Sequence, residues 1–300
     1  MSSYLEANAR ERLALFDSFE EFVGPAQRVV SPHLAQLNAP VSFDDGVVVG
    51  RARLGDYAVF AAAQEGGFMG GAVGEVHGAK LVGMLRRAVA EKPDAVVLLL
   101  ETGGVRLHEA NAGLIAVSEV MRAVLDARDA GIPVIVLIGG ANGAFGGMGI
   151  VARCANTLII SEEGRLAMSG PEVIETANGV EEFDSRDRAL VWRTTGGKHR
   201  YLMGDVQRIV DDSVPAFRAA AIEAIAAIAA ARDAQNGAVG LTLEAMEAEQ
   251  AMLEQRIARF GALPDPLDVW AAMGVGKPAE VPMLDVAAFT AAANPHRQGV

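Results

Sequence analysis

The sequence predicts an α/β fold in which a buried strand, a glycine-rich turn and a helix follow one another several times. Continuous apolar runs at residues 95–100 and 134–138 have the length and composition of fully buried strands. A glycine pair follows each run, at Gly103-Gly104 and at Gly146-Gly147. Helical patterns come after these turns, so the chain alternates between strands and the helices that cover them.

The N-terminal elements come before this alternation. Residues 4–22 carry apolar side chains at helical spacing and are predicted to form an arm helix. Residues 24–40 contain three prolines and are predicted to be an extended connection. Residues 47–49 and 57–63 are predicted strands, and the intervening Gly55-Asp56 suits a hairpin turn.

The remaining elements define three regions of the chain. In order, they are helices at 75–91 and 109–130, a short helix ending near residue 155, strands at 157–161 and 165–167, and helices at 215–232 and 241–260. Residues 178–200 are polar and show no clear period. We therefore expect an N-terminal arm over 1–40, a core over 41–213, and a helical region over 214–300 that packs on the core or on a partner.

Composition limits the function classes. The 300 residues have a net charge of −12 and a pI of about 4.9, which disfavours binding to nucleic acid phosphates. The lone Cys154 excludes an internal disulfide and a cysteine-only zinc site, and it fits a reducing compartment. The N-terminus lacks an apolar signal core, and residues 216–231 are expected to be too weakly hydrophobic to span a membrane. These features predict a cytoplasmic protein with no membrane partner.

The glycine turns are the candidate chemical site. The N-terminus of a helix exposes unpaired N–H groups and the positive end of the helix dipole. Two such turns that converge can form an oxyanion hole, which needs two fixed donors aimed at one developing charge. Gly103-Gly104 and Gly146-Gly147 are the candidates. For either pair alone, we favour a compact strand-to-helix connection with no chemical role.

Three ordered motifs carry a family resemblance. They are GGFMGGAVGEVHGAK at 66–80, LLLETGGVRLHEA at 98–110, and GGANGAFGG at 139–147 with AMSGPEVIE at 167–175. Together they resemble the carboxyltransferase halves of acyl-CoA carboxylases, within the crotonase-like superfamily. The polar segment GVEEFDSRDRALVWRTTGGKHR at 179–200 resembles the β subunits of malonate decarboxylases.

The resemblance implies a fold and a set of site residues. The fold is a crotonase-like spiral of ββα units, here with an N-terminal arm helix and C-terminal helices. The implied thioester-binding amides belong to the turns containing Gly103, Gly104, Gly146 and Gly147. Gly70 and Gly71 match a glycine pair beside the acyl-carrier arm. The implied substrate-binding residues are Gly70, Gly71, Arg106, Ser169 and Glu172.

The resemblance also implies an activity and partners. The activity is decarboxylation of a malonyl thioester carried on a dephospho-CoA-derived phosphopantetheine arm of an acyl-carrier subunit. No cofactor bound covalently to this chain and no metal are expected. Only one crotonase-like half is present, so a homologous γ-type subunit is expected to supply the other. A biotin-dependent carboxyltransferase subunit and a non-catalytic crotonase-like scaffold remain alternatives.

Other polar residues have simpler interpretations. Glu172 resembles one catalytic glutamate of enoyl-CoA hydratases, but the second would fall near Gly149, so we favour an acid that complements a helix dipole. Ser169 is interpreted as an N-cap and Cys154 as an inert buried thiol. The cationic cluster at 198–200 is either a solvated face or a site for a partner or carrier protein. The three histidines near these motifs, His77, His108 and His199, are predicted to be structural or surface residues.

Overall fold

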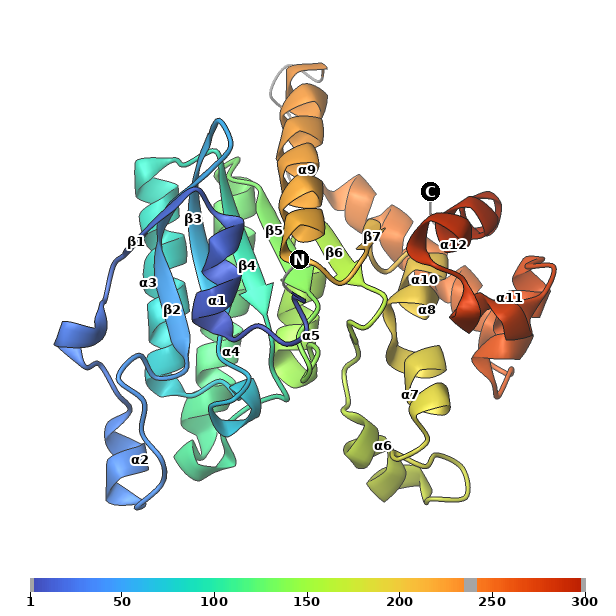
Figure 1. Ribbon diagram of the computed structural model, residues 1–300, viewed down its shortest axis with the longest axis horizontal. Helices are drawn as coiled ribbons and strands as arrows, with labels where there is room; N and C mark the ends of the chain where they lie inside the picture. Colours follow the sequence, from blue (N-terminus) through green and yellow to red (C-terminus); the bar gives the residue numbers. More distant parts are fainter. Residues whose placement is uncertain (1–2, 235–241, 298–300) are drawn as a thin grey trace.

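A mixed sheet forms the centre of the protein (Figure 1). The computed structural model describes residues 3–234 and 242–297, and within these ranges the sheet has seven strands that lie in chain order. The strands are β1 Ser18–Glu21, β2 Val47–Leu54, β3 Tyr57–Gln64, β4 Ala95–Leu100, β5 Val134–Ile138, β6 Thr157–Ser161 and β7 Arg208–Val210. β1, β2 and β3 pair antiparallel, whereas β3 to β7 are parallel. The predicted α/β class is confirmed.

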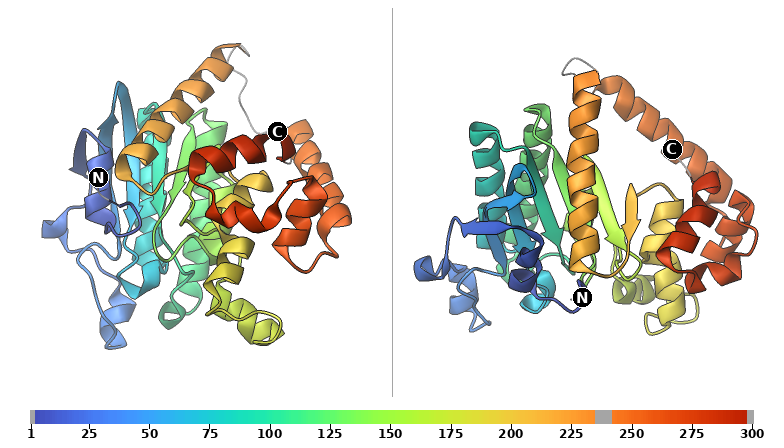
Figure 2. Two further views of the ribbon diagram at one scale, coloured as in Figure 1. Left: turned by 45° about the vertical axis from the view of Figure 1, so that its right-hand side comes forward. Right: turned by 45° about the horizontal axis from the view of Figure 1, so that its top comes forward.

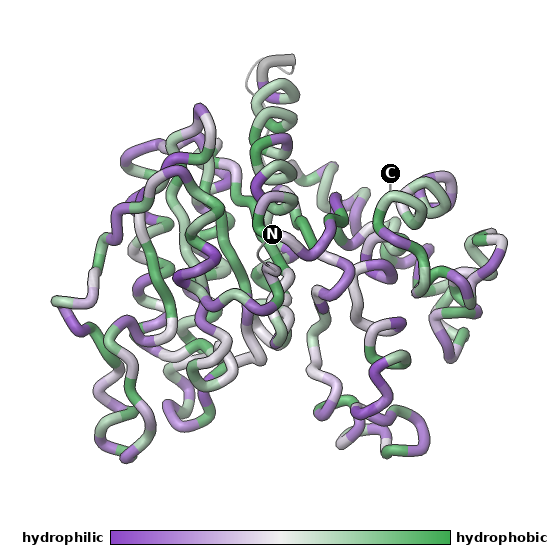
Figure 3. Tube along the Cα trace, viewed as in Figure 1, coloured by the Kyte–Doolittle hydropathy of each residue, from purple (hydrophilic) through white to green (hydrophobic). Residues whose placement is uncertain are grey.

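Helices cover both faces of the sheet (Figures 1 and 2). In β4, Val96 and Leu98 belong to one buried cluster, and Val97 and Leu99 belong to the other, because successive strand residues face opposite sides. The first cluster includes residues of α3 Glu75–Glu91, α4 Asn111–Asp129 and α5 Gly146–Arg153, and the second includes α9 Val214–Ala234. Figure 3 shows hydrophobic residues along the central strands and α9.

The second strand of each ββα unit is very short. After β3, β4, β5 and β6 the chain forms isolated parallel bridges, which join Val73 to Val105, Thr102 to Ala144, and Ala144 to Leu166. The predicted strand at 165–167 is therefore reduced to bridge pairs at its first two residues. These bridges tie together the chain segments that carry the glycine turns.

The predicted arm helix over residues 4–22 is wrong for most of its length. The structure has α1 Ala9–Arg12, a short 3-10 helix at Leu13–Leu15, and then β1. β1 pairs with β2 along its whole length, so edge pairing overrides the weak helical period. A short helix, α2 Pro32–Gln36, also lies inside the predicted extended connection.

Polar residues 178–200, which showed no period, contain helical turns. The elements there are α7 Arg188–Thr195 and α8 Gly197–Leu202, after α6 Pro171–Asn178. The C-terminal elements are α10 Leu243–Phe260, α11 Pro266–Met273, the 3-10 helix Pro278–Met283, and α12 Val286–Ala293. α11 and α12 pack on the first core cluster, whereas α10 is exposed along most of its length.

Within the part of the chain that the structure describes, one helix is long and apolar enough to cross a membrane by length and composition. This segment, Val214–Arg232 of α9, has a mean hydropathy of 1.6, so the expectation that it is too weakly hydrophobic to span is not supported. Its residues Phe217, Ala221 and Ile225 are buried against the sheet. That contact packs one face of α9 on its own core, and 33% of the apolar segment is buried there.

Candidate active site

The glycine turns lie at the carboxyl ends of neighbouring parallel strands and contact one another. A Cβ atom added to Gly146 would lie 3.0 Å from Cα of Gly104, so the second and third turns touch. The first turn packs beneath the second, because a Cβ on Gly71 would overlap the carbonyl oxygen of Glu101. The positive φ angles of Gly104 and Gly146, 138° and 63°, are values that L side chains rarely adopt.

Two of the predicted donor amides are already used within the fold. The N–H of Gly103 donates to the carbonyl oxygen of Gly70 at 2.8 Å, and the N–H of Gly146 donates to that of Met168 at 3.0 Å. Their backbone N–H groups therefore hold the turns in place, and the prediction that they serve as oxyanion donors is corrected. The N–H of Gly104 donates to Oγ1 of Thr102 at 3.1 Å.

Two amides on the same turns remain free, that of Gly147, which is among the predicted donors, and that of Val105, which is not. Among the residues that the structure describes, no acceptor is hydrogen-bonded to the N–H of Gly147 or of Val105. Gly147 lies in the first turn of α5, which has no side-chain cap. Val105 lies between two bonds to Val73, which donates to the Gly104 oxygen at 2.9 Å and accepts from Arg106 at 3.0 Å. Alternation along an extended chain turns the intervening Val105 N–H away from Val73.

Val105 was not identified as a donor from the sequence. The motif draws attention to its glycines, but the N–H that is left free belongs to the residue after them. No strand period predicts this, because alternation after Gly103, whose N–H faces Gly70, would turn the Val105 N–H toward the first glycine turn as well, and the φ of 138° at Gly104 breaks that alternation.

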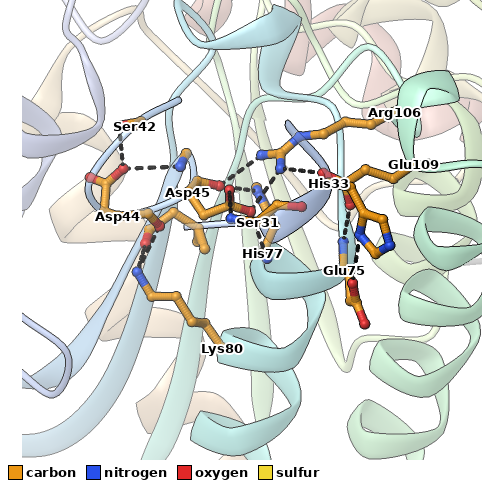
Figure 4. A network of polar contacts seen from close by, with 12 residues as sticks. Ser31, His33, Ser42, Asp44, Asp45, Glu75, His77, Lys80, Arg106 and Glu109 are labelled. Atoms are coloured by element: carbon orange, nitrogen blue, oxygen red, sulfur yellow. Dashed lines mark hydrogen bonds and ion pairs between the residues drawn. The ribbon is translucent and has the colours of Figure 1, made fainter. Parts of the chain in front are cut away.

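The N-terminus of α3, in contrast, is occupied by the protein's own carboxylates (Figure 4). The N–H of Glu75 donates to Oε2 of Glu109 at 2.6 Å, and that of His77 donates to Oδ2 of Asp45 at 2.9 Å. Arg106 Nη1 pairs with Asp45 at 2.7 Å and with Glu109 at 3.1 Å. These carboxylates satisfy the helix terminus, so α3 offers no open anion site despite its preceding glycines.

Arg106 therefore has a different role from the one predicted. Its side chain is fully buried between the two carboxylates and cannot reach a substrate, so the predicted substrate contact is corrected. Burial raises the pKa of Asp45, and the neighbouring guanidinium opposes that rise.

A second buried cluster holds the three turns from beneath. The carboxylate of Glu101 pairs with Arg12 of the N-terminal arm and accepts the N–H of Asn142. Asn142 Nδ2 also donates to the carbonyl oxygen of Gly66 at 2.8 Å. A Cβ at Gly66 or Gly140 would overlap the Glu101 carboxylate, so only glycine fits at those positions.

Comparison with known proteins places this geometry in a family. The profile of the carboxyl transferase domain matches residues 7–209. The chain belongs to the carboxyl transferase family. A Malonomonas rubra protein named malonyl-S-ACP:biotin-protein carboxyltransferase MADC is 48% identical over 233 residues, 72% of this chain and 73% of that protein.

Solved structures extend the match over nearly the whole chain. In the crystal structure of a Pseudomonas malonate decarboxylase hetero-tetramer in complex with malonate, one chain is 36% identical with a TM-score of 0.80, covering 91% of this chain and 97% of that chain. A chain of the Pseudomonas malonate decarboxylase MdcD-MdcE hetero-dimer is 35% identical with a TM-score of 0.61, covering 75% and 88%. The resemblance to malonate decarboxylase β subunits is confirmed.

Ser169 and Glu172, which the resemblance implies are substrate-binding residues, lie at the start of α6. The N-cap of α6 is Gly170 without a side-chain hydrogen bond, so the interpretation of Ser169 as an N-cap is wrong. Pro171 occupies the first helical position and needs no N–H partner. Glu172 is exposed in the first turn, where its charge complements the helix dipole as predicted. Met168, whose carbonyl oxygen holds Gly146, links this segment to the third glycine turn.

The cationic cluster at 198–200 lies largely inside the protein and does not form an open patch. Lys198 pairs with Glu162 at 3.0 Å and donates to the carbonyl oxygens of Pro282 and Leu284. Arg200 pairs with Asp205, and Trp270 Nε1 donates to His199 Nδ1 at 3.1 Å. The cluster therefore joins α8 to the C-terminal helices, which corrects both sequence interpretations of it.

The structural interpretation of two histidines agrees with their surroundings. His77 is fully buried. Its Nε2 accepts a hydrogen bond from the side-chain amide of Gln64, and its Nδ1 donates to the backbone carbonyl oxygen of Asp45 at 3.1 Å. Burial lowers the pKa of His77 to about 3, and it lowers the pKa of His199 to about 3 as well. His108 is exposed. Over the described ranges, no group of three or more His, Cys, Asp or Glu residues could hold a metal.

We expect His77 to make stability depend on pH. The unfolded chain binds a proton at this site below about pH 6.5, whereas the folded chain binds one only near pH 3. The stability that this neutral residue contributes is therefore complete above pH 6.5 and is lost as the pH falls toward 3. Urea unfolding at pH 7.5 and pH 5 checks this, with His77→Gln as the comparison. The prediction would be contradicted if, between pH 7.5 and pH 5, the free energy of unfolding of the wild type fell no more than that of His77→Gln.

Cys154 has no sign of reactivity. It is half-buried at the C-terminal end of α5, and its carbonyl oxygen accepts from Arg128. Burial raises the pKa of its thiol, which disfavours the nucleophilic thiolate. This environment agrees with the interpretation of an inert cysteine.

Proposed function

We propose that this chain is the catalytic carboxyltransferase-type subunit of a malonate decarboxylase. It converts a malonyl thioester on an acyl-carrier protein to the acetyl thioester. The observation that carries the proposal is the pair of free backbone amides, Val105 and Gly147, on two touching glycine turns. The sequence match to malonyl-S-ACP carboxyltransferase and the structural match to malonate decarboxylase support the substrate class.

The chemistry needs only that these amides bind a developing negative charge. The bond between the malonyl CH₂ and its carboxylate breaks, and its electron pair forms the carbon–carbon double bond of an enolate. Carbon dioxide leaves, and the thioester oxygen becomes anionic between the Val105 and Gly147 N–H groups. Each donor is worth about 3 kcal/mol if it matches known oxyanion-hole donors. A proton from water or from a partner residue then completes the acetyl group.

The partners follow from the same reasoning. The substrate arrives on a dephospho-CoA-derived phosphopantetheine arm of an acyl-carrier subunit, so this chain needs no covalent cofactor. A homologous γ-type subunit covers the glycine turns and excludes water from them. Exposed apolar side chains near these turns, including Leu107 and Ile115, support such a cover. The complex works in the cytoplasm, where the single thiol stays reduced.

Transfer of the carboxyl group to a biotin protein is the second candidate. The name of the Malonomonas rubra relative favours it, because that protein transfers the carboxyl group from malonyl-S-ACP to a biotin protein. Both reactions pass through the same enolate, so the amides serve either one. The carboxyl acceptor distinguishes them. A non-catalytic scaffold is the third possibility, and free donors in two touching turns argue against it.

One experiment distinguishes these possibilities. The chain is co-expressed with the subunits encoded beside it, and carbon dioxide release from a malonyl thioester on the purified carrier is measured with and without avidin. Turnover that avidin does not affect is expected for direct decarboxylation. Turnover that avidin abolishes would establish biotin transfer instead. An assembled complex that leaves the malonyl thioester unchanged would support the scaffold interpretation.

A further inference from the structure

Arg106 is anchored on both its backbone and its side chain. Its N–H donates to the carbonyl oxygen of Val73 at 3.0 Å, and its Nη2 donates to that of Asp45 at 2.8 Å. Its Nη1 holds the carboxylates of Asp45 and Glu109 (Figure 4). Val105 is the residue immediately before it, so these anchors restrict the peptide that carries the free Val105 N–H.

We propose that Arg106 is a positioning residue that holds the Val105 amide in the direction required to bind the enolate oxygen. Its side chain does not touch the substrate and acts only through the backbone. The inference rests on the proposed function for its catalytic consequence. The geometric part, that Arg106 orders the turn, concerns the protein alone.

The charges explain why an arginine is needed at this position. Asp45 and Glu109 are fully buried, and both face the N-terminus of α3. The helix dipole offsets only part of their combined charge, because it amounts to about half an elementary charge. The planar guanidinium offsets one further elementary charge and contacts both side chains at once. Without it, the carboxylates would take up protons or separate.

Separation of these groups would move the turn. Asp45 belongs to the loop before β2, and Glu109 belongs to the turn before α4, so Arg106 is the link between two segments that flank Val105. The ring of Phe68 from the first glycine turn also lies against the guanidinium, with 5.2 Å between Cζ and the ring centroid. Loss of the side chain would therefore loosen all three segments around the donor.

The test compares Arg106→Met and Arg106→Lys in the full chain, with Arg10→Gln as the matched control. Arg10 also pairs with this loop, at 3.3 Å from Asp44, but it is partly exposed, and its hydrogen bonds and ion pairs within the described part of the chain go to Glu21 and Asp44. Hydrogen exchange of the amides at 102–106 is measured first. Exchange should quicken in Arg106→Met, quicken less in Arg106→Lys, and stay unchanged in Arg10→Gln.

Kinetics of the assembled complex provide the second measurement. In Arg106→Met, kcat should fall about 10- to 100-fold because a donor displaced by about 1 Å binds the transition state poorly. KM for the malonyl thioester should stay within about twofold, since the enolate gains most from the amide. Arg106→Lys should recover part of the loss.

The outcomes separate this inference from the proposed function. Wild-type exchange rates at 102–106 in both Arg106 variants would overturn the positioning role, whatever the complex catalyses. A folded Arg106→Met complex with wild-type kcat would also overturn it. If Arg106→Met does not fold, Arg106→Lys carries the same two measurements. An inactive wild-type complex would refute the proposed decarboxylation, while the exchange measurement would still decide the role of Arg106.

Discussion

Gly147→Pro is expected to turn over malonyl thioester about 100- to 1,000-fold more slowly than Gly147→Ala, because it lacks one oxyanion donor. Gly147 is the second residue of α5, a position where proline is compatible with a helix. The two variants differ in the N–H group that the proposed mechanism uses. Their ratio of kcat therefore measures the donor more directly than either variant compared with wild type.

The local packing determines how this experiment is built. A Cβ at Gly147 would lie 2.5 Å from Cγ1 of Val117 on α4, so both variants should carry Val117→Ala to make room. Gly104→Pro would be a poorer test, because a φ of 138° is incompatible with proline and the Gly104 N–H already contacts Thr102. Equal kcat values for the two folded Gly147 variants would show that its N–H is not a donor.

The sequence locates the turns and one of the two free amides, that of Gly147, but not that of Val105. Close packing of these turns leaves no room for a Cβ atom, so the turns require glycine. A glycine pair after a buried strand can therefore be found in the sequence. Which N–H stays free depends on distant acceptors, such as Gly70 for Gly103 and Met168 for Gly146. No local pattern encodes those contacts. Of the two free N–H groups, that of Gly147 was among the predicted donors, whereas that of Val105 belongs to the residue after the predicted pair.

The same limit applies to charged residues and to the N-terminal arm. The family resemblance implies a substrate contact for Arg106, but its partner Asp45 lies 61 residues earlier and draws it into the core. The residues of β1 are predicted to be helical because their own sequence does not show that they pair with Arg51 and Arg53 of β2, which are distant in the chain. Strands β4 and β5 could be predicted because they are buried on both faces, and that burial by itself produces a continuous apolar run in the sequence.

Purified alone, this chain is expected to decarboxylate malonyl thioester at least about 100-fold more slowly than it does with its partner, because an open site lets water compete for both amides. Exposed apolar side chains near the turns mark the surface to be covered. Leu107 precedes α4, Ile115 lies in its second turn, and the carbonyl oxygen of Met168 accepts the N–H of Gly146 in the third glycine turn. These three residues are 85%, 61% and 71% exposed. A monomer gains nothing from leaving such residues in water.

A point variant tests where that cover binds. Ile115→Asp places a charge on this surface and should weaken partner binding and turnover together, with the fold kept intact because the side chain is exposed. Met283→Asp is the matched control, since Met283 is 85% exposed in the C-terminal region, away from the glycine turns. Sedimentation with and without the partner subunit measures binding, and carbon dioxide release measures turnover. Full activity of the isolated chain, with no change in mass when the partner is added, would contradict the two-subunit site. Loss of binding in Met283→Asp but not in Ile115→Asp would place the interface on the C-terminal helices, and the glycine turns would then need another cover.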